Sequence, residues 1–260
     1  MIRIAAVGDL HYDRLSRGRL AAHLGALREV ADVLLLAGDL TQVGHVEEAY
    51  ALADDLAESP VPVVAVFGNH DFHSDQNALV RGALEEAGVT VLEKQACRLE
   101  IRSSSVGIVG LKGFGGGFVG ACATEFGEPE TKAFVRTTKA MARYLHEALL
   151  ELDTDYRIAL LHYSPISGTL HGEKREIYPF LGSYLLGEAA DEGGADIVFH
   201  GHAHAGCEKG ETSGGVPVRN VAQHVIRHVF NLYSLNKEGI VLHQGLVPHA
   251  RLTPSHAPDQ

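Results

Sequence analysis

The sequence predicts an α/β fold in a single domain, with a parallel core and a more antiparallel second half. Short apolar segments with the length of buried strands alternate with longer segments in which apolar residues recur at helical spacing. Such alternation is typical of parallel strands joined by right-handed helical crossovers. The 260 residues contain no internal repeat and no linker-like break, and 45% of them are hydrophobic, which is enough to form a substantial core.

In the first half of the chain, predicted strands and helices alternate. The strands are predicted at Ile2–Val7, Val33–Ala37 and Pro62–Val66. A helix is predicted around Leu20, Leu24 and Leu27, and another from Val46 to Ala57, because apolar residues recur there every three or four positions. A further helix is predicted to begin after Asn77 and to end near Gly88.

In the second half, strands are predicted at Cys97–Ile101, Val106–Leu111, Arg157–Leu161, Asp196–Phe199, Val216–Val221, Val229–Tyr233 and Gly239–His243. The longest helical pattern runs from Pro129 to Leu152, and proline is tolerated in the first turn of a helix. The tail after Pro248 is predicted to be frayed.

Two long loops are predicted at 113–127 and 164–184, and loops of this length are more often functional than idle. In the second loop, Lys174 and Arg175 are candidates to bind a second phosphate of a substrate. Tyr178 and Phe180 are candidates to stack on a base, although for any one of these residues a position in a solvated surface loop is slightly favoured.

Composition excludes several classes of function. The net charge of −11 argues against a nucleic-acid partner, because non-specific binding to nucleic acid depends on a broad basic surface. The three cysteines are far apart and form neither a disulfide framework nor a Cys-x-x-Cys zinc site. No apolar stretch reaches the length of about 18 residues that spans a membrane, and no signal-peptide pattern is present. We therefore expect a cytoplasmic protein without a membrane partner.

Polar side chains that bind metals follow five of the predicted strands. They are Asp9, His11, Asp39, Asn69, His70, Asp71, His162, His202 and His204. Open α/β sheets place their functional sites at this carboxyl edge of the strands. A single strand followed by Asp, Asn or His is common by chance, but five such strands in one chain predict a functional site. Of the other histidines, His200 is predicted to pack behind this site, and His224 to lie at a strand edge or behind a ligand.

The types of side chain indicate a metal centre. Seven of these nine side chains, namely two carboxylates, one amide and four imidazoles, form a set of ligands that suits Mn, Fe or Zn better than Ca. These seven ligands exceed the need of one four-coordinate zinc ion. If one carboxylate bridges, they supply about four ligands to each of two ions, and such a pair can activate water for attack on phosphorus.

These motifs, from Asp9 to His204, resemble the complete motif set of calcineurin-like metallophosphoesterases. The resemblance implies a four-layer α-β-β-α sandwich, in which two mixed β-sheets are flanked by helices. It implies that one metal is held by Asp9, His11, Asp39 and His204. It implies that the second is held by Asp39, Asn69, His162 and His202, so that Asp39 bridges. His70 then corresponds to the non-ligand histidine that contacts the phosphate and is a candidate to protonate the leaving alkoxide.

Several residues differ from those that known branches of this family carry at the same positions, and these differences argue against three branches. Gln42 stands where phosphoprotein phosphatases have aspartate and purple acid phosphatases have tyrosine, and the latter also lack a histidine equivalent to His11. Asp71 replaces the glutamate of the phosphoprotein phosphatases, and His70 replaces the usual arginine of lipid-A precursor pyrophosphatases. The remaining resemblance is to the phosphodiesterase-like branch, which includes bacterial cyclic-nucleotide phosphodiesterases. What orients His70 stays open, with Asp71 as a nearby candidate.

The leading hypothesis is a dinuclear phosphodiesterase acting on a small soluble ester, for which a cyclic nucleotide is a candidate. The resemblance implies direct attack by a metal-bridging hydroxide, with Mn or Fe favoured over Zn. The alternative is a broad-specificity phosphomonoesterase, which differs only in the shape of its pocket. A nuclease or a non-catalytic binding scaffold is less favoured, because the chain is acidic and all seven ligands are present. The oligomeric state stays open.

Overall fold

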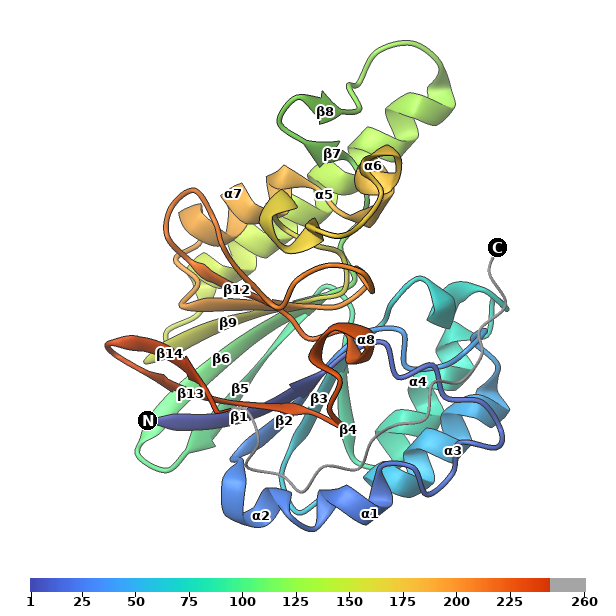
Figure 1. Cartoon of the computed structure of the whole chain (residues 1–260), viewed down its shortest axis with the longest axis vertical. Coiled ribbons are helices and arrows are strands. Elements are labelled where there is room, and N and C mark those ends of the chain that lie inside the picture. The colour runs from blue at the N-terminus through green and yellow to red at the C-terminus, as the bar shows by residue number, and fades with distance from the viewer. Residues whose placement is uncertain (244–260) are drawn as a thin grey trace.

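The computed structural model describes residues 1–243, and in this part the chain forms two six-stranded sheets that pack face to face between outer layers of helices (Figure 1). This four-layer arrangement of two mixed sheets confirms the predicted fold class. The predicted fraying after Pro248 lies outside the described residues. Within residues 1–243, no helix combines the length and apolar character needed to cross a bilayer.

The first sheet contains the predicted parallel strands of the first half. Its order is β14-β13-β1-β2-β3-β4. The parallel members are β1 (Ile2–Val7), β2 (Val33–Ala37), β3 (Val63–Val66) and β4 (Val89–Leu92). The antiparallel members, from the end of the described chain, are β13 (Asn231–Asn236) and β14 (Gly239–Leu242). Its outer face is covered by α1 (Ala21–Leu24), α2 (Leu27–Val30), α3 (Val46–Leu56) and α4 (Asn77–Glu86).

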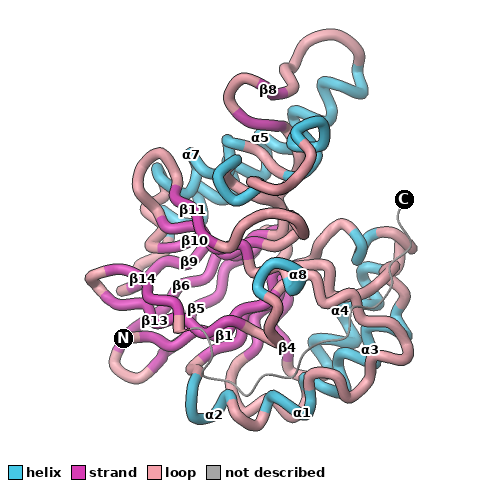
Figure 2. Tube along the Cα trace, in the orientation of Figure 1, coloured by secondary structure: helices cyan, strands magenta, loops and turns pink. Residues whose placement is uncertain are grey.

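The second sheet has the order β11-β12-β10-β9-β6-β5 (Figure 2). Its strands are β5 (Gln95–Ile101), β6 (Ser104–Leu111), β9 (Tyr156–Leu161), β10 (Ile197–His200), β11 (Lys209–Glu211) and β12 (Pro217–Asn220). The helices on its outer face are α5 (Pro129–Glu151) and α7 (Tyr184–Glu192), which pack against each other. Beyond them project a small hairpin of β7 (Gly117–Phe118) and β8 (Ala121–Cys122), and the short helix α6 (Tyr178–Leu181).

The direction of the strands in the second sheet corrects one expectation. Strands β6, β9, β10 and β12 run parallel to one another, and only the outer pairs with β5 and β11 are antiparallel. The expected more antiparallel second half is therefore wrong at the centre of this sheet. The physical reason is that α5 and α7 each carry the chain back to the same edge, so that the next strand starts in the same direction.

Two apolar layers hold the sandwich together. The larger core lies between the sheets and beneath α1–α4, and it includes every residue of β2, which is buried on both faces. The second core lies between the second sheet and helices α5 and α7, where Leu145, Leu149 and Leu186 are fully buried. Because both sheets are covered on both sides, their central strands are continuously apolar, and polar groups appear only where the strands end.

Two consecutive leucines of α5 provide a test of this packing. Leu149 is fully buried against the second sheet, whereas the neighbouring Leu150 is 54% exposed. Leu149→Ala is expected to lower the free energy of unfolding by about 2–5 kcal/mol because it leaves a cavity. Leu150→Ala is expected to change it by less than about 0.5 kcal/mol. Urea unfolding of both variants measures the difference, and equal losses would contradict this orientation of α5.

Candidate metal centre

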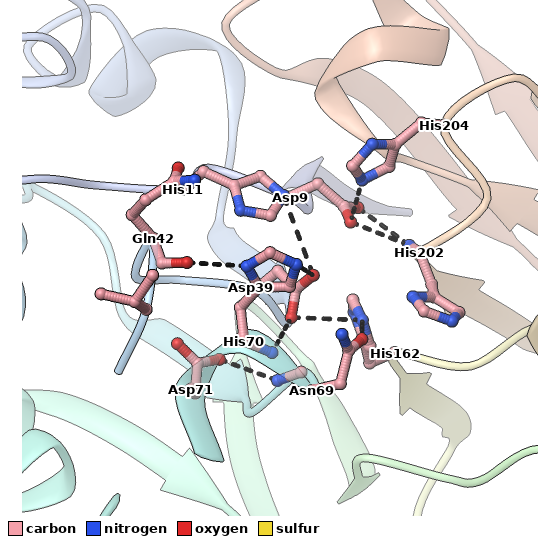
Figure 3. Close-up of polar contacts among 12 residues, drawn as sticks. Asp9, His11, Asp39, Gln42, Asn69, His70, Asp71, His162, His202 and His204 are labelled. Atoms are coloured by element: carbon pink, nitrogen blue, oxygen red, sulfur yellow. Dashed lines mark hydrogen bonds and ion pairs between the residues drawn. The ribbon is translucent and has the colours of Figure 1, made fainter. Parts of the chain in front are cut away.

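The carboxyl ends of strands from both sheets converge on one site (Figure 3). In the first sheet, Asp9 follows β1 by two residues and Asp39 follows β2 by two. Asn69 and His70 follow the next strand, β3. In the second sheet, His162 directly follows β9, and the segment carrying His202 and His204 follows the adjacent β10. Since β1, β2 and β3 are parallel neighbours, as are β9 and β10, these side chains form two facing rows.

Hydrogen bonds join the two sheets at this edge. The backbone N–H of Gly8 donates to Val221 O across the sheet interface at 2.8 Å. The Nδ1 of His162 lies 2.9 Å from Ala37 O, so it donates to the end of β2 in the opposite sheet. These contacts fix the distance between the two rows of polar side chains.

The backbone at the site is strained. Asp9, His11, Asp39 and His202 have positive φ values of 58°, 44°, 47° and 70°. Residues with a side chain rarely adopt this left-handed region, and such strain concentrates at functional sites. Hydrogen bonds hold the conformation, since Asp9 N donates to Gly38 O at 2.9 Å and His11 N donates to Asp39 O at 3.0 Å. The strain directs the two carboxylates toward the facing sheet.

The first group of donor atoms has four members. Asp9, His11, Asp39 and His204 each place one oxygen or nitrogen within 4.8 Å of the others. Within this group, His204 Nε2 and Asp9 Oδ1 lie 2.8 Å apart. Both ring nitrogens of His11 are buried and have no hydrogen-bond partner. Because an unpaired buried nitrogen is costly, this environment fits a cation bound by His11.

The second group shares Asp39 with the first. Asp39, His162 and His202 place donor atoms within 4.8 Å of one another, and Asn69 Oδ1 lies 3.0 Å from His162 Nε2. One ring nitrogen of each histidine is hydrogen-bonded to a backbone carbonyl. His162 Nδ1 donates to Ala37 O, and His202 Nε2 donates to Phe180 O at 3.2 Å. Such contacts orient a histidine ligand and leave His162 Nε2, which adjoins Asn69 Oδ1, and His202 Nδ1 as the candidate metal-binding atoms.

The charges in the site also favour cations. Asp9 and Asp39 are each 1% exposed, and within residues 1–243 no lysine or arginine nitrogen lies within 4.0 Å of either carboxylate. Burial opposes ionisation of Asp39, but His162 and His11 outweigh it and hold the pKa of this carboxyl below its usual range. The two buried carboxylates therefore stay negative and need positive compensation.

The imidazoles divide into two kinds. Burial lowers the pKa of His11 to about 4 and that of His202 to about 3, so both are neutral at pH 7 with a lone pair free for a metal. Burial also opposes the protonated form of His162, but Asp39 and Asp9 raise its pKa to about 9. The two carboxylates thus favour positive charge at the position of His162.

His70 lies beside the donor groups but belongs to neither. Its Nδ1 donates to the backbone carbonyl of Gln42 at 2.7 Å, and its Nε2 lies 4.0 Å from Asp39 Oδ2. The side chain is 38% exposed, so it is accessible from outside. The group that orients His70 is therefore the Gln42 carbonyl.

Asp71 does not orient His70. Its carboxylate is fully buried and accepts hydrogen bonds from the backbone N–H groups of Leu40, Thr41 and Gly68, at 3.1, 2.8 and 2.8 Å. It also accepts one from the Thr41 hydroxyl at 2.6 Å. Asp71 instead ties the loop after β2 to the loop after β3, and these loops carry Asp39 and Asn69.

The remaining histidines lie as predicted. His200 is buried behind the site, where its Nδ1 donates to Gly201 O at 2.8 Å and its Nε2 lies 2.9 Å from the Thr169 hydroxyl. His224, on α8 (Gln223–Ile226), stacks on His204 with ring centroids 4.4 Å apart and planes at 14°. His224 is thus a neighbour of a candidate ligand.

The 164–184 loop approaches the site through one atom that sequence reasoning missed. This atom is the Phe180 carbonyl on α6, which holds His202. The Phe180 side chain is 61% exposed, whereas the Tyr178 hydroxyl donates to Leu170 O at 3.0 Å and its ring packs against a buried cluster. Of the two proposed stacking residues, only Phe180 has a largely free ring.

Lys112 is a second residue that sequence reasoning missed. It directly follows β6, which pairs in parallel with β9, so it stands beside His162. Its carbonyl accepts the backbone N–H groups of His162 and Tyr163, both at 3.0 Å. The signal that could have found it is its position at the carboxyl end of a buried strand.

The family model of calcineurin-like phosphoesterases matches residues 2–206. The chain belongs to this family. It is accordingly a metallophosphoesterase, a hydrolase of phosphoric esters, and its candidate ligands indicate divalent metal ions. No match to this calcineurin-like phosphoesterase was found among curated proteins.

Several solved structures resemble this calcineurin-like phosphoesterase. Phosphopantetheinyl hydrolase from Mycobacterium tuberculosis aligns with a TM-score of 0.61 at 16% identity, over 98% of each chain. A putative 5′-nucleotidase from Staphylococcus aureus aligns with a TM-score of 0.59 at 15% identity, over 98% of this chain and 56% of that chain. A protein of Thermus thermophilus, TT1561, aligns with a TM-score of 0.56 at 16% identity, over 93% of this chain and 98% of that chain. At these identities, the similarity shows the fold alone.

Gly38 provides a test of how the site is built. Its φ is +83°, and a Cβ there would lie 2.5 Å from His162 Nδ1. Gly38→Ala is expected to displace His162 and to lower both the metal content per chain and the melting temperature. Gly82→Ala in α4 is the matched control, because no atom lies within 4 Å of its Cβ and alanine favours a helix. Elemental analysis and thermal unfolding measure both variants, and full metal content in Gly38→Ala would contradict this role of the close approach.

Proposed function

We propose that this calcineurin-like phosphoesterase is a dinuclear metal-dependent phosphodiesterase that acts on a small soluble ester through one domain. The observation that carries the proposal is the shared Asp39, which belongs to both groups of donor atoms and can therefore bridge two ions. A single-metal site would need no such sharing. A cyclic nucleotide is one substrate of this class.

The residues that would hold the metals follow from the two groups. The first metal would be held by Asp9, His11, Asp39 and His204, and the second by Asp39, Asn69, His162 and His202. This mixture of carboxylate, amide and imidazole donors suits Mn, Fe or Zn, and we favour Mn or Fe. When bound, the two cations would lower the pKa of a water and offset the negative charge of the phosphoryl oxygens.

His70 would donate a proton to the leaving group. Its Nδ1 proton is held by the Gln42 carbonyl, so the proton that the ring can release is the one on Nε2. Nε2 is the ring nitrogen on the side of Asp39, where the ester would lie. Transfer of this proton to the leaving alkoxide would avoid the release of a strongly basic alkoxide.

The preference for a diester rests on the residues around this histidine. Gln42 contributes only its backbone carbonyl to the hydrogen bonds at the site, and no tyrosine or second aspartate stands at that position. His70 occupies the place that arginine takes in the pyrophosphatase branch. A broad-specificity phosphomonoesterase with the same metals remains the second candidate, because only the pocket would differ.

Metal analysis combined with a paired assay tests the proposal. In the presence of Mn²⁺, we expect about two metals per chain and faster hydrolysis of bis(4-nitrophenyl) phosphate than of 4-nitrophenyl phosphate. Asp39→Asn is expected to lose metal and at least about a hundredfold in turnover, whereas Asp153→Asn, at an exposed position, should match the parent. Preference for the monoester would support the second candidate. Absence of both metal and turnover would contradict the enzyme assignment.

His70 has a separate prediction. His70→Ala is expected to keep the metals and to slow turnover by about 10²–10⁴-fold for esters with a poor leaving group. The loss should be much smaller for 4-nitrophenolate, which leaves without a proton. His73→Ala, at an exposed position three residues later, is the control. Loss of metal from His70→Ala, or equal losses for both leaving groups, would show that His70 is not the proton donor.

A further inference from the structure

Lys112 stands at the same edge as the candidate ligands. Its backbone carbonyl binds the N–H groups of His162 and Tyr163, so its position is fixed relative to the second group of donors. Neither the metals nor the proton transfer described above requires a lysine here.

The Lys112 ammonium lies among three aromatic rings. Its Nζ is 4.7 Å from the ring centre of Phe72, 5.3 Å from that of Phe114 and 5.7 Å from that of Tyr163. Phe72 is two residues after His70, and the Tyr163 ring packs 4.4 Å from the ring of His202. The ammonium is therefore held against side chains that adjoin the site, and cation–π attraction fixes its direction.

Within residues 1–243 this ammonium has no hydrogen-bond acceptor and no carboxylate within 4.0 Å. Lys112 is half-buried, and burial lowers its pKa, while Glu93, Asp39 and Asp71 act in the opposite direction. Its three N–H donors are thus available, in a place where water competes weakly. Such a group is equipped to bind an anion.

We propose that Lys112 binds a second anionic group of the substrate, a phosphate or a carboxylate that is separate from the reacting phosphorus. This rests on the proposed function. The reacting phosphoryl group belongs over Asp39, between the two groups of donors, whereas the Lys112 ammonium lies more than 4.0 Å from the Asp39 carboxylate, among the rings of Phe72, Phe114 and Tyr163. The half-buried ring of Phe114 provides apolar surface beside the ammonium for the part of the ester that links the two anions.

A series of diesters that share the same leaving group tests this assignment. Ethyl 4-nitrophenyl phosphate and its analogues with a carboxylate or phosphate at the end of a two- to four-carbon alkyl chain all release 4-nitrophenolate. We expect the parent enzyme with Mn²⁺ to have a higher kcat/KM for at least one anionic analogue. Lys112→Met should lose about tenfold or more of that preference, mainly through KM, while hydrolysis of the ethyl ester is kept.

Three variants complete the design. Lys112→Arg keeps the positive charge and should keep most of the preference. Lys209→Met removes the same charge from the exposed strand β11 and should change nothing. If the parent prefers none of the anionic esters, or if Lys112→Met slows all of them and the ethyl ester equally, the proposal is wrong. Preference for carboxylate over phosphate, or the reverse, identifies the source of the anion.

A binding measurement separates this inference from the proposed function. Calorimetric titration of the Mn²⁺-loaded protein with ethylphosphonate and with carboxyalkylphosphonates requires no turnover. Tighter binding of a carboxyalkylphosphonate that Lys112→Met abolishes would support the assignment even if no diester is hydrolysed. Equal affinities in the parent would overturn it even if diesters are hydrolysed.

Glu93 provides the competing structural explanation. Its Oε2 is buried without a hydrogen-bond partner, so Lys112 could serve only to neutralise this carboxylate. In that case Lys112→Met should lower the melting temperature and Glu93→Gln should restore it, with no change in the relative kcat/KM of the two ester types. Loss of the preference in the Lys112→Met/Glu93→Gln double variant as well would show that the lysine acts on the substrate.

Discussion

The structure depends on two buried carboxylates that have no lysine or arginine beside them in the described chain. Asp9 and Asp39 are supplied by the first sheet, and the positive or hydrogen-bonding groups that balance them are supplied largely by the second, through His162 and His204. A buried charge is strongly unfavourable unless it is compensated. The two sheets must therefore meet at this edge, and the site is also part of what holds them together.

The same requirement explains the backbone around the site. The facing rows approach so closely that a Cβ at Gly201 would lie 2.3 Å from Asp9 Oδ2. Within the first sheet, a Cβ at Gly68 would lie 2.1 Å from Asp39 Oδ1 in the neighbouring loop. Asp71 organises the loops that make this approach, because it gathers three backbone N–H groups around one carboxylate. Burial and the nearby Asp39 raise the pKa of Asp71 to about 6, while its hydrogen bonds from Thr41 and Gly68 act in the opposite direction.

Sequence reasoning brought the correct residues together where the signal is local. A buried strand followed by Asp, Asn or His can be recognised within ten residues, and the seven candidate ligands recognised in this way lie together, while their role as ligands stays a prediction. Strand direction in the second sheet is a long-range property set by α5 and α7, so it was predicted incorrectly at the sheet centre. The carbonyls of Ala37, Gln42 and Phe180 carry no signal, because every residue has a carbonyl and only the fold decides where it points. Lys112 also follows a buried strand, but a lysine is not a metal ligand and so is not part of the pattern that marks the other strand ends.

The carbonyl of Phe180 orients His202 and so links the projecting part of the molecule, the β7–β8 hairpin with α6, to the metal centre. The loop before β7 is bound to α6, since Gly116 N donates to Pro179 O at 2.7 Å and Gly117 N donates to Gly182 O at 2.9 Å. The β7–β8 hairpin and α6 are therefore joined, and the Phe180 carbonyl on α6 sets the ring orientation of His202. Contacts that orient a metal ligand affect the metal as well as the ring. The segment nearest the exposed Phe180 ring is therefore joined to the second group of ligands by one hydrogen bond, from His202 to the Phe180 carbonyl.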